Sequence, residues 1–313
     1  MDTPSATRQS NSPLPWASCA TVEDVVDWLR SNTDVEVMAK VQPTCVAIAT
    51  PRSSSEREAM IVDVEATFPD RQGQRHIRSV GLVIFRYDAA TGRLGQVTLS
   101  ITLTPHASVA GHWHVSSQAG MTGLPSVVTA EQVAAWLADC EWVVSHHAEF
   151  DRPLVESVFP AFCSKPWACS HRGIDWRSHG IRCAKLEYLA MRTGHWYVPH
   201  DAETDCHALL AVLASEVPEA PRTWLDILIK AETPDTVVVK MGPTPYVHDA
   251  RERGYRRNGD WLQARFDVAS YQRELPALRR NLHLAFSFRP HSLHRIGATD
   301  RYSCRPGAAL PTP

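Results

Sequence analysis

Two carboxylates lie two positions apart in the chain, at Asp63 and Glu65. The residues around them, 59–66, are largely apolar and β-branched, which predicts a strand whose alternate side chains project from one face. Two neighbouring carboxylates repel each other, and a folded chain tolerates them mainly when a cation lies between them. The pair therefore predicts a metal site. The alternative is a solvated edge strand, which the flanking Val62 and Val64 disfavour because they would face apolar packing.

Three further residues that could take part in such chemistry lie at the ends of predicted elements. Asp151 follows a short apolar strand at 142–145, and a proline two positions later fits the first turn of a helix. His200 and Asp205 lie where a last helix begins. Asp151 could also be a helix N-cap, which is compatible with a metal role. His200 could be an ordinary surface histidine, but its pairing with Asp205 favours a catalytic base, because histidine titrates near neutral pH.

The elements that would position these residues are strands first, and then strands and helices in alternation. Apolar runs predict strands at 79–87 and 96–104, which the turn residues between them would join as a hairpin. The segment 112–114 is predicted to be a loop. Helices are predicted at 21–30, 129–138, 150–158 and 201–216. This order of elements indicates an α/β domain with a mixed sheet flanked by helices.

The length of 313 residues favours about two domains. We expect a disordered tail at 1–20, a short helical segment and linker at 21–58, a main domain at 59–218, and a small C-terminal domain and tail at 219–313. The linker would be 51–58, and the small domain would contain a strand at 236–240 and a short helix at 249–254. Its end, after Asp300, is expected to be loose.

The composition restricts the partners and the compartment. Apolar residues make up 44% of the chain and charged residues 21%, as in a globular protein with a sizeable core. The net charge is only −2 and the pI about 6.7, so a nucleic-acid site would have to be a local patch. The sequence shows no apolar signal segment, no run of roughly 18 apolar residues, and eight cysteines without paired spacing. We therefore expect a cytoplasmic protein with reduced thiols and no membrane partner.

Three segments together resemble the motifs of the DEDDh 3′→5′ exonucleases, the family that includes the proofreading epsilon subunit of bacterial DNA polymerase III. The pair at 63 and 65 resembles the first motif, and residues 145–151 resemble the second. Residues 200–205, a histidine followed five positions later by an aspartate, resemble the third. The resemblance covers 59–216. It implies a ribonuclease H-like fold, a mixed five-stranded sheet flanked by helices, to which we expect a smaller C-terminal α+β unit to be added.

By this resemblance, the protein would hydrolyse phosphodiester bonds from the 3′ end of single-stranded DNA and release nucleoside 5′-monophosphates. Two ions of Mg²⁺ or Mn²⁺ would be held by four carboxylates, those of Asp63, Glu65, Asp151 and Asp205. His200 would take a proton from the attacking water. The chain departs from the family pattern at His147, where asparagine is usual, and this departure leaves the substrate preference open.

Two alternatives also remain open. One is an exoribonuclease of the same fold that acts on RNA or short oligonucleotides, because a metal site that acts on phosphate does not read the sugar. The other is a non-catalytic module that binds nucleic acid or a polymerase, against which the retention of all five site residues argues. No clamp-binding peptide is evident in the sequence, so a polymerase partner is without support.

The C-terminal part of the chain, 251–289, is rich in arginines interleaved with aromatic residues such as Tyr255 and Phe266. Such a strip could bind phosphates and stack bases. It could equally be an ordinary solvated face, which is what most runs of charge are.

Overall fold

The structure is a computed structural model that describes residues 21–31, 35–46, 51–218, 220–241, 251–252, 254–258, 261–280, 290–303 and 308–310. The tail predicted at 1–20 lies outside these residues, as does much of the helix predicted at 249–254, of which Arg251 and Glu252 are described as helical. Cys19 and Cys304 also lie outside them. The six described cysteines are free thiols, as expected.

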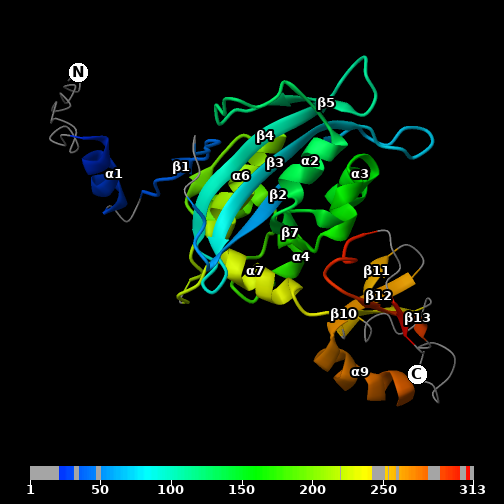
Figure 1. Ribbon diagram of the computed structural model, residues 1–313. Helices are drawn as coiled ribbons and strands as arrows, with labels where there is room; N and C mark the ends of the chain where they lie inside the picture. Colours follow the sequence, from blue (N-terminus) through cyan, green and yellow to red (C-terminus); the bar gives the residue numbers. More distant parts are fainter. Residues whose placement is uncertain are drawn as a thin grey trace, which may run out of the picture.

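A mixed sheet of seven strands forms the centre of the larger unit (Figure 1). From one edge to the other, the strands are β6 (Val127–Thr129), β5 (His112–Ser116), β4 (Leu94–Pro105), β3 (Ile77–Asp88), β2 (Glu56–Ala66), β7 (Cys140–Ser145) and β8 (Trp167–Cys169). Neighbours from β2 to β6 pair antiparallel, whereas β7 pairs parallel with β2 and β8 with β7. The four strands predicted up to 145 are confirmed as β2, β3, β4 and β7.

The sheet has seven strands where five were predicted, because β5 and β6 extend it beyond β4. The loop predicted at 112–114 is the start of β5. These strands were missed because each buries a single side chain, Trp113 in β5 and Val128 in β6. One buried residue in a short strand makes no recognisable alternation. The predicted linker at 51–58 also ends early, since β2 begins at Glu56.

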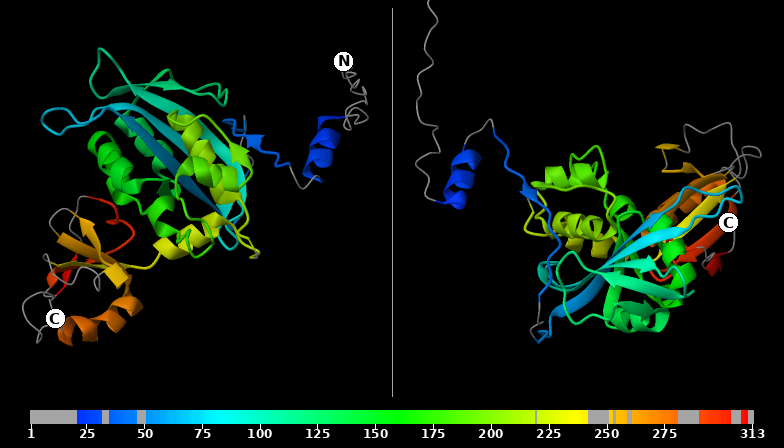
Figure 2. Two further views of the ribbon diagram at one scale, coloured as in Figure 1. Left: turned by 180° about the vertical axis from the view of Figure 1, so that it is seen from behind. Right: turned by 90° about the horizontal axis from the view of Figure 1, so that it is seen from above.

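Helices cover both faces of this sheet (Figures 1 and 2). One face carries α5 (Leu186–Arg192), α6 (Ala202–Ala214) and α7 (Trp224–Glu232), and the other carries α2 (Ala130–Leu137), α3 (Ala148–Val158) and the 3-10 helix η2 (Pro160–Ser164). A short helix, α4 (Ser170–Gly173), follows β8. Along β2, Ile61 packs with the first group and Met60 and Val62 with the second. Because side chains alternate along a strand, Asp63 and Glu65 lie on the face that α6 covers.

The segment before the sheet begins with the predicted helix, α1 (Val22–Arg30). Thr21 caps it: its hydroxyl accepts from the Asp24 N–H at 3.1 Å, and the Asp24 carboxylate accepts from the Thr21 N–H at 3.0 Å. This reciprocal pair is a capping box, which satisfies two backbone donors at the start of a helix.

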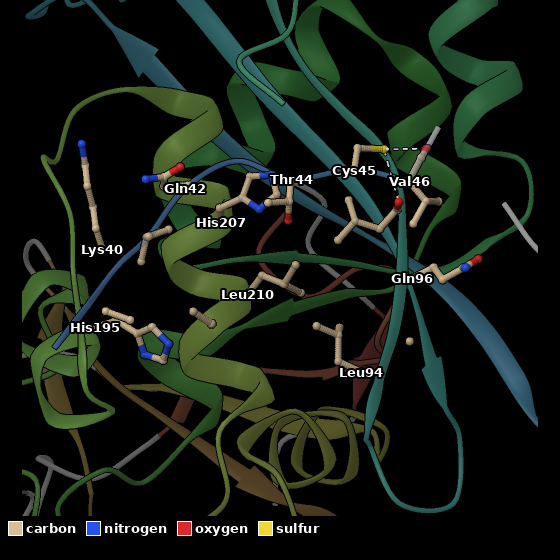
Figure 3. Close-up of a pocket in the computed structure, with 15 residues that line it drawn as sticks. Lys40, Gln42, Thr44, Cys45, Val46, Leu94, Gln96, His195, His207 and Leu210 are labelled. Carbon is tan, nitrogen blue, oxygen red and sulfur yellow. Dashed lines mark hydrogen bonds between the residues drawn. The ribbon is translucent and has the colours of Figure 1, made fainter. Parts of the chain in front are cut away.

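Further along this segment, β1 (Ala39–Lys40) pairs in parallel with β9 (His195–Trp196). The chain that continues from β1 lines a cavity of about 570 Å³ together with β4 and α6 (Figure 3). The Cys45 thiol donates to the Val97 carbonyl of β4 at 3.2 Å, and this contact holds the segment against the sheet.

Among the described residues, the smaller unit has a second sheet of five antiparallel strands. Its strands, in spatial order, are β11 (Arg256–Asn258), β12 (Trp261–Asp267), β10 (Thr236–Met241), β13 (Pro290–Ile296) and β14 (Ala308–Leu310), and α9 (Val268–Arg280) follows β12. The strand predicted at 236–240 is the central strand, β10. The loose end predicted after Asp300 is wrong for the residues described there, since Arg301 and Tyr302 are buried and β14 joins the sheet.

Two buried arginines join the smaller unit to the larger one. Arg152 of α3 donates to Glu156 at 2.7 Å, to the Thr299 carbonyl at 2.6 Å and to the Arg301 carbonyl. Arg301 in turn donates to the buried carboxylate of Glu232 at the end of α7. These contacts order the chain after position 300 because each would leave a buried polar group unpaired if it were broken.

Replacing Arg152 by methionine should lower the free energy of unfolding by about 3–5 kcal/mol. The change removes one partner of a buried ion pair and leaves two carbonyl groups without this hydrogen-bond donor. Urea denaturation would measure the loss. Arg57→Gln is the control, since Arg57 pairs with Glu141 at 2.9 Å but the two side chains are 40% and 48% exposed. An exposed pair contributes at most about 1 kcal/mol. Equal losses in the two variants would contradict a structural role for Arg152.

Candidate metal centre

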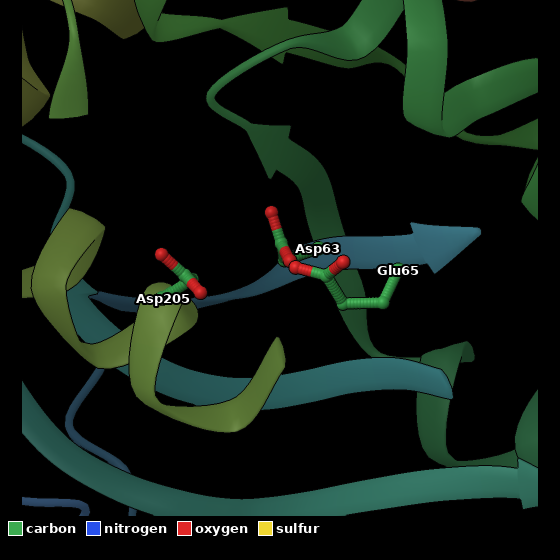
Figure 4. Close-up of side chains that lie close together, drawn as sticks. All are labelled: Asp63, Glu65 and Asp205. Atoms are coloured by element: carbon green, nitrogen blue, oxygen red, sulfur yellow. The ribbon is translucent and has the colours of Figure 1, made fainter. Parts of the chain in front are cut away.

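Three of the predicted site residues converge where β2 meets the first turn of α6. Asp63 and Glu65 come from β2 and Asp205 from α6 (Figure 4). Each contributes a carboxylate oxygen, and these three atoms all lie within 4.8 Å of one another. Within the part of the chain that the structure describes, no other three or more metal-ligating side chains converge in this way. The arrangement could hold a metal ion.

Close packing between α6 and β3 brings Asp205 to this position. Gly81 of β3 lies directly opposite Asp63 in the strand register. A Cβ atom at Gly81 would lie 2.2 Å from the carbonyl oxygen of Ala202, the first residue of α6. Only a glycine therefore allows the helix to approach the sheet so closely.

The start of α6 is also held by its own side chains. Asp201 is the N-cap and accepts from the Thr204 N–H at 3.0 Å. Asp205 accepts from the Asp201 N–H at 2.9 Å. The Asp205 carboxylate is thereby fixed in orientation by the backbone turn that precedes it.

Asp151 lies beside the group of three but is not part of it. One of its oxygens accepts from the Val64 N–H at 3.1 Å, and the other accepts from the Ser145 hydroxyl. The side chain is buried, 2% exposed, between β2 and β7. The structure thus places the fourth predicted ligand next to the cluster with both oxygens already hydrogen-bonded to protein.

The pKa values of Asp63, Asp151 and Asp205 are raised. Burial raises the pKa of Asp63 well above its usual range, and the charges of Asp151, Asp205 and Glu65 raise it further. Burial also raises the pKa of Asp151 to about 7 and that of Asp205 to about 6. Crowded carboxylates without a counter-charge behave in this way, and a cation between them would reverse the effect. Their hard oxygen donors suit Mg²⁺ or Mn²⁺.

His200 lies at the mouth of the cluster, just before the N-cap of α6. Its Nδ1 is 3.8 Å from a carboxylate oxygen of Glu65, and its side chain is 83% exposed. Its backbone is in the left-handed region, with φ of 72°, which is uncommon for a residue other than glycine. An exposed imidazole beside the carboxylates is free to meet a substrate or a water molecule.

His147, the residue that departs from the family pattern, occupies the N-cap position of α3 and is exposed. Its ring centroid lies 5.3 Å from that of His171, and the His171 ring also meets His146 edge-on. Burial lowers the pKa of His146 to about 4. His147 therefore belongs to a group of imidazoles beside Asp151, and it does not join the three carboxylates.

A buried polar network that the sequence did not reveal supports the turn that carries His200. Glu203 of α6 is fully buried and accepts from the Ser100 hydroxyl at 2.6 Å and from the Gln118 N–H at 2.9 Å. The Gln118 side chain then donates to Asp201 at 2.7 Å. In the sequence, Glu203 resembles any acidic residue in a first helical turn, so no local signal distinguishes it.

No helix among the described residues combines the length and the apolar character needed to cross a membrane. Neither the family models nor the curated proteins with which we compared the chain gave a match.

Proposed function

We propose that this protein is a metal-dependent 3′→5′ exonuclease that releases nucleoside 5′-monophosphates from single-stranded DNA. The observation that carries the proposal is the convergence of Asp63, Glu65 and Asp205, with the His200 imidazole beside Glu65. These residues belong to the first and third motifs, and Asp151, from the second, lies beside them with its oxygens hydrogen-bonded to Val64 and Ser145. A carboxylate cluster with one exposed imidazole is suited to hydrolysis at phosphorus, because it provides both metal ligands and a base.

The fold supports this proposal. A ribonuclease H-like domain needs a mixed five-stranded sheet with helices on both faces. Strands β4, β3, β2, β7 and β8 fit that description, with the first three antiparallel and the last two parallel. In this interpretation β5 and β6 are additions at one edge.

In the proposed reaction, Asp63, Glu65 and Asp205 would hold the divalent ions, and Asp151 would join them only if its hydrogen bonds rearranged. When bound, the ions would supply positive charge that stabilises the negative charge developing on the phosphate. His200 removes a proton from the attacking water. Its Nδ1 faces Glu65, so Nε2 is the nitrogen left to accept that proton, and the Glu65 carboxylate would stabilise the imidazolium that forms.

Oligonucleotides labelled at the 5′ end, incubated with Mg²⁺, Mn²⁺ or a chelator, would test the proposal. We expect the label to shift stepwise through a ladder of shorter products with either ion and to remain unchanged with the chelator. Parallel DNA and RNA substrates would distinguish the two sugars. Release of the label as a mononucleotide at the first step would mean the opposite polarity, and no cleavage of any substrate would refute the proposed activity.

Replacing His200 by alanine should reduce turnover about 10²- to 10⁴-fold, because proton transfer is lost while the three carboxylates stay in place. Titration with Mn²⁺ should give wild-type binding. His114→Ala is the matched control, since His114 is an exposed histidine on β5 outside the cluster. If His200→Ala turned over substrate as fast as His114→Ala across the pH range, the histidine would not be the base.

A further inference from the structure

A second, oppositely charged site lies where the two units meet. Among the described residues, five arginines and two glutamates line a cleft of about 470 Å³. The arginines come from both units, with Arg172 on α4, Arg256 and Arg257 on β11, and Arg265 on β12. The fifth, Arg301, is buried against Glu232 and belongs to the interface described above. In a chain with a net charge of −2, this is a local concentration of positive charge.

The two glutamates that line the cleft are outnumbered by its five arginines. Glu149 is shared between Arg172 of the larger unit at 3.4 Å and Arg265 of the smaller unit at 3.2 Å. All three side chains are partly exposed, so these ion pairs are weak and can be exchanged for other anions. Arg256 donates to the carbonyls of Arg251 and Tyr255, which leaves its positive charge in place.

The cleft begins next to the acidic centre. Glu149, which lines it, and Asp151, which lies beside the three carboxylates, share the first turn of α3. Two residues of a helix are about 3 Å apart along its axis but about 200° apart around it, so Asp151 faces the core and Glu149 faces the cleft. A strand that ends at the acidic centre would have to pass over this one helical turn to bring its adjoining phosphates to the cleft.

The aromatic residues do not take part as the sequence suggested. Tyr255 is fully buried in the core of the smaller unit and packs edge-on against Phe266. Tyr302 lines the cleft but is buried, with the Arg265 guanidinium 4.9 Å above its ring. Both tyrosine rings are thus buried, and the cleft presents guanidinium groups. Such a surface contacts phosphates and does not read bases.

We infer that this arginine cleft binds the phosphodiester backbone of a single-stranded nucleic acid, at the nucleotides that precede the 3′ end in the acidic centre. The inference rests on the proposed function for its direction along the strand. Binding is independent of base sequence and depends on salt, since each phosphate contact releases counterions.

Point variants are needed to test this site, because removing the chain after 219 would also remove Trp224, Leu225 and Leu228 from the core of the larger unit. The double variant Arg256→Gln, Arg257→Gln should bind a labelled single strand more weakly in chelator, where no hydrolysis occurs. Two lost phosphate contacts should reduce the slope of log affinity against log salt by about 1.4. The control is Arg93→Gln, Arg192→Gln, a pair of exposed arginines outside the cleft, which should keep the wild-type slope.

Glu149→Gln should have the opposite effect and tighten binding, because it frees Arg172 and Arg265 from their shared carboxylate. A purely structural role for these residues would not produce a gain. Mixed-sequence strands should bind alike, and poly-glutamate should compete poorly.

The possible failures are distinguishable. If the wild-type chain cleaves oligonucleotides but both double variants keep its salt slope, the cleft is not the binding site and the proposed activity stands. If the arginine variants bind more weakly but no chain cleaves any substrate, the proposed activity fails and the binding site stands. Competition by poly-glutamate as strong as by an oligonucleotide would overturn the assignment to nucleic acid.

Discussion

Replacing Asp63 by asparagine should raise the thermal midpoint of the metal-free protein and, at the same time, abolish hydrolysis. Asp63 is half-buried beside other carboxylates. The loss of solvation and the charges of its neighbours raise its pKa, so its ionised form destabilises the fold when no cation is present. Asparagine has the same shape without the charge. A gain of about 1 kcal/mol would raise the midpoint by about 2–4 °C for a domain of this size. Thermal melting in chelator at neutral pH would measure it.

Divalent ions should reverse the order of the thermal midpoints, so that the wild type melts at a higher temperature than Asp63→Asn. An ion that binds only the folded state stabilises it by about 2.7 kcal/mol at a concentration of 100 times its Kd. The wild type should gain this stabilisation from Mg²⁺ or Mn²⁺, and Asp63→Asn should gain much less. Asp139→Asn, at an exposed carboxylate outside the cluster, should respond as the wild type does. An equal gain in Asp63→Asn and wild type would exclude these carboxylates as the metal centre.

The same carboxylates set the pH dependence of the metal-free protein. Because the pKa values of Asp151 and Asp205 are raised to about 7 and about 6, their protonated forms favour folding. That contribution is complete below the ordinary carboxyl pKa and is lost as the pH rises through 6 and 7. Stability in chelator should therefore fall over this interval, and saturating Mg²⁺ should flatten the decline.

Replacing Gly81 by alanine should disable the site without touching any of its functional groups. The new methyl group would lie 2.2 Å from the Ala202 carbonyl oxygen, so α6 must move away from β3. Overpacking of this kind costs about 1–3 kcal/mol. Asp205 moves with the helix, and a shift of about 1 Å can reduce the rate about 10²-fold. Turnover measured well below the melting temperature would separate the two effects.

Gly95→Ala is the matched control for that experiment. Gly95 is also a strand glycine, on β4, but its added methyl would meet the end of the Glu56 side chain at 3.0 Å and no backbone atom closer than 3.4 Å. We expect near-normal stability and turnover. If Gly81→Ala matched this control, the close approach of α6 to β3 would not be what positions Asp205.

The parts of the site that could be predicted are those encoded by neighbours in the chain. Asp63 and Glu65 share a face because they are two apart in a strand, and the position of Asp205 follows from the start of a helix. Whether Asp151 lies among these carboxylates or beside them depends on the Ser145 hydroxyl and the Val64 N–H, which would compete with a metal ion for its oxygens. These two donors reach Asp151 only once the strands have paired, so the sequence alone does not reveal them.

The parts that could not be predicted depend on pairs of residues far apart in the chain. Gly81 matters because Ala202 packs against it. Glu203 matters because Ser100 and Gln118 donate hydrogen bonds to it. The ordered end of the chain depends in the same way on Arg152, whose partners follow about 150 residues later. A sequence read locally contains no signal for such contacts. The roles of Gly81 and Glu203 were therefore not predicted, and the end of the chain was expected to be loose.

The left-handed backbone at His200 has a consequence for how this protein could change over generations. That conformation costs a residue with a Cβ atom about 1–2 kcal/mol, whereas glycine adopts it freely. Selection for heat resistance alone would therefore favour glycine at position 200 and discard the imidazole. Under that pressure a single replacement would make the chain more stable and remove the base that we propose, with its carboxylates and its fold unchanged. If the proposed role is right, descendants that keep histidine here would be those in which selection preserves hydrolysis at a cost in stability.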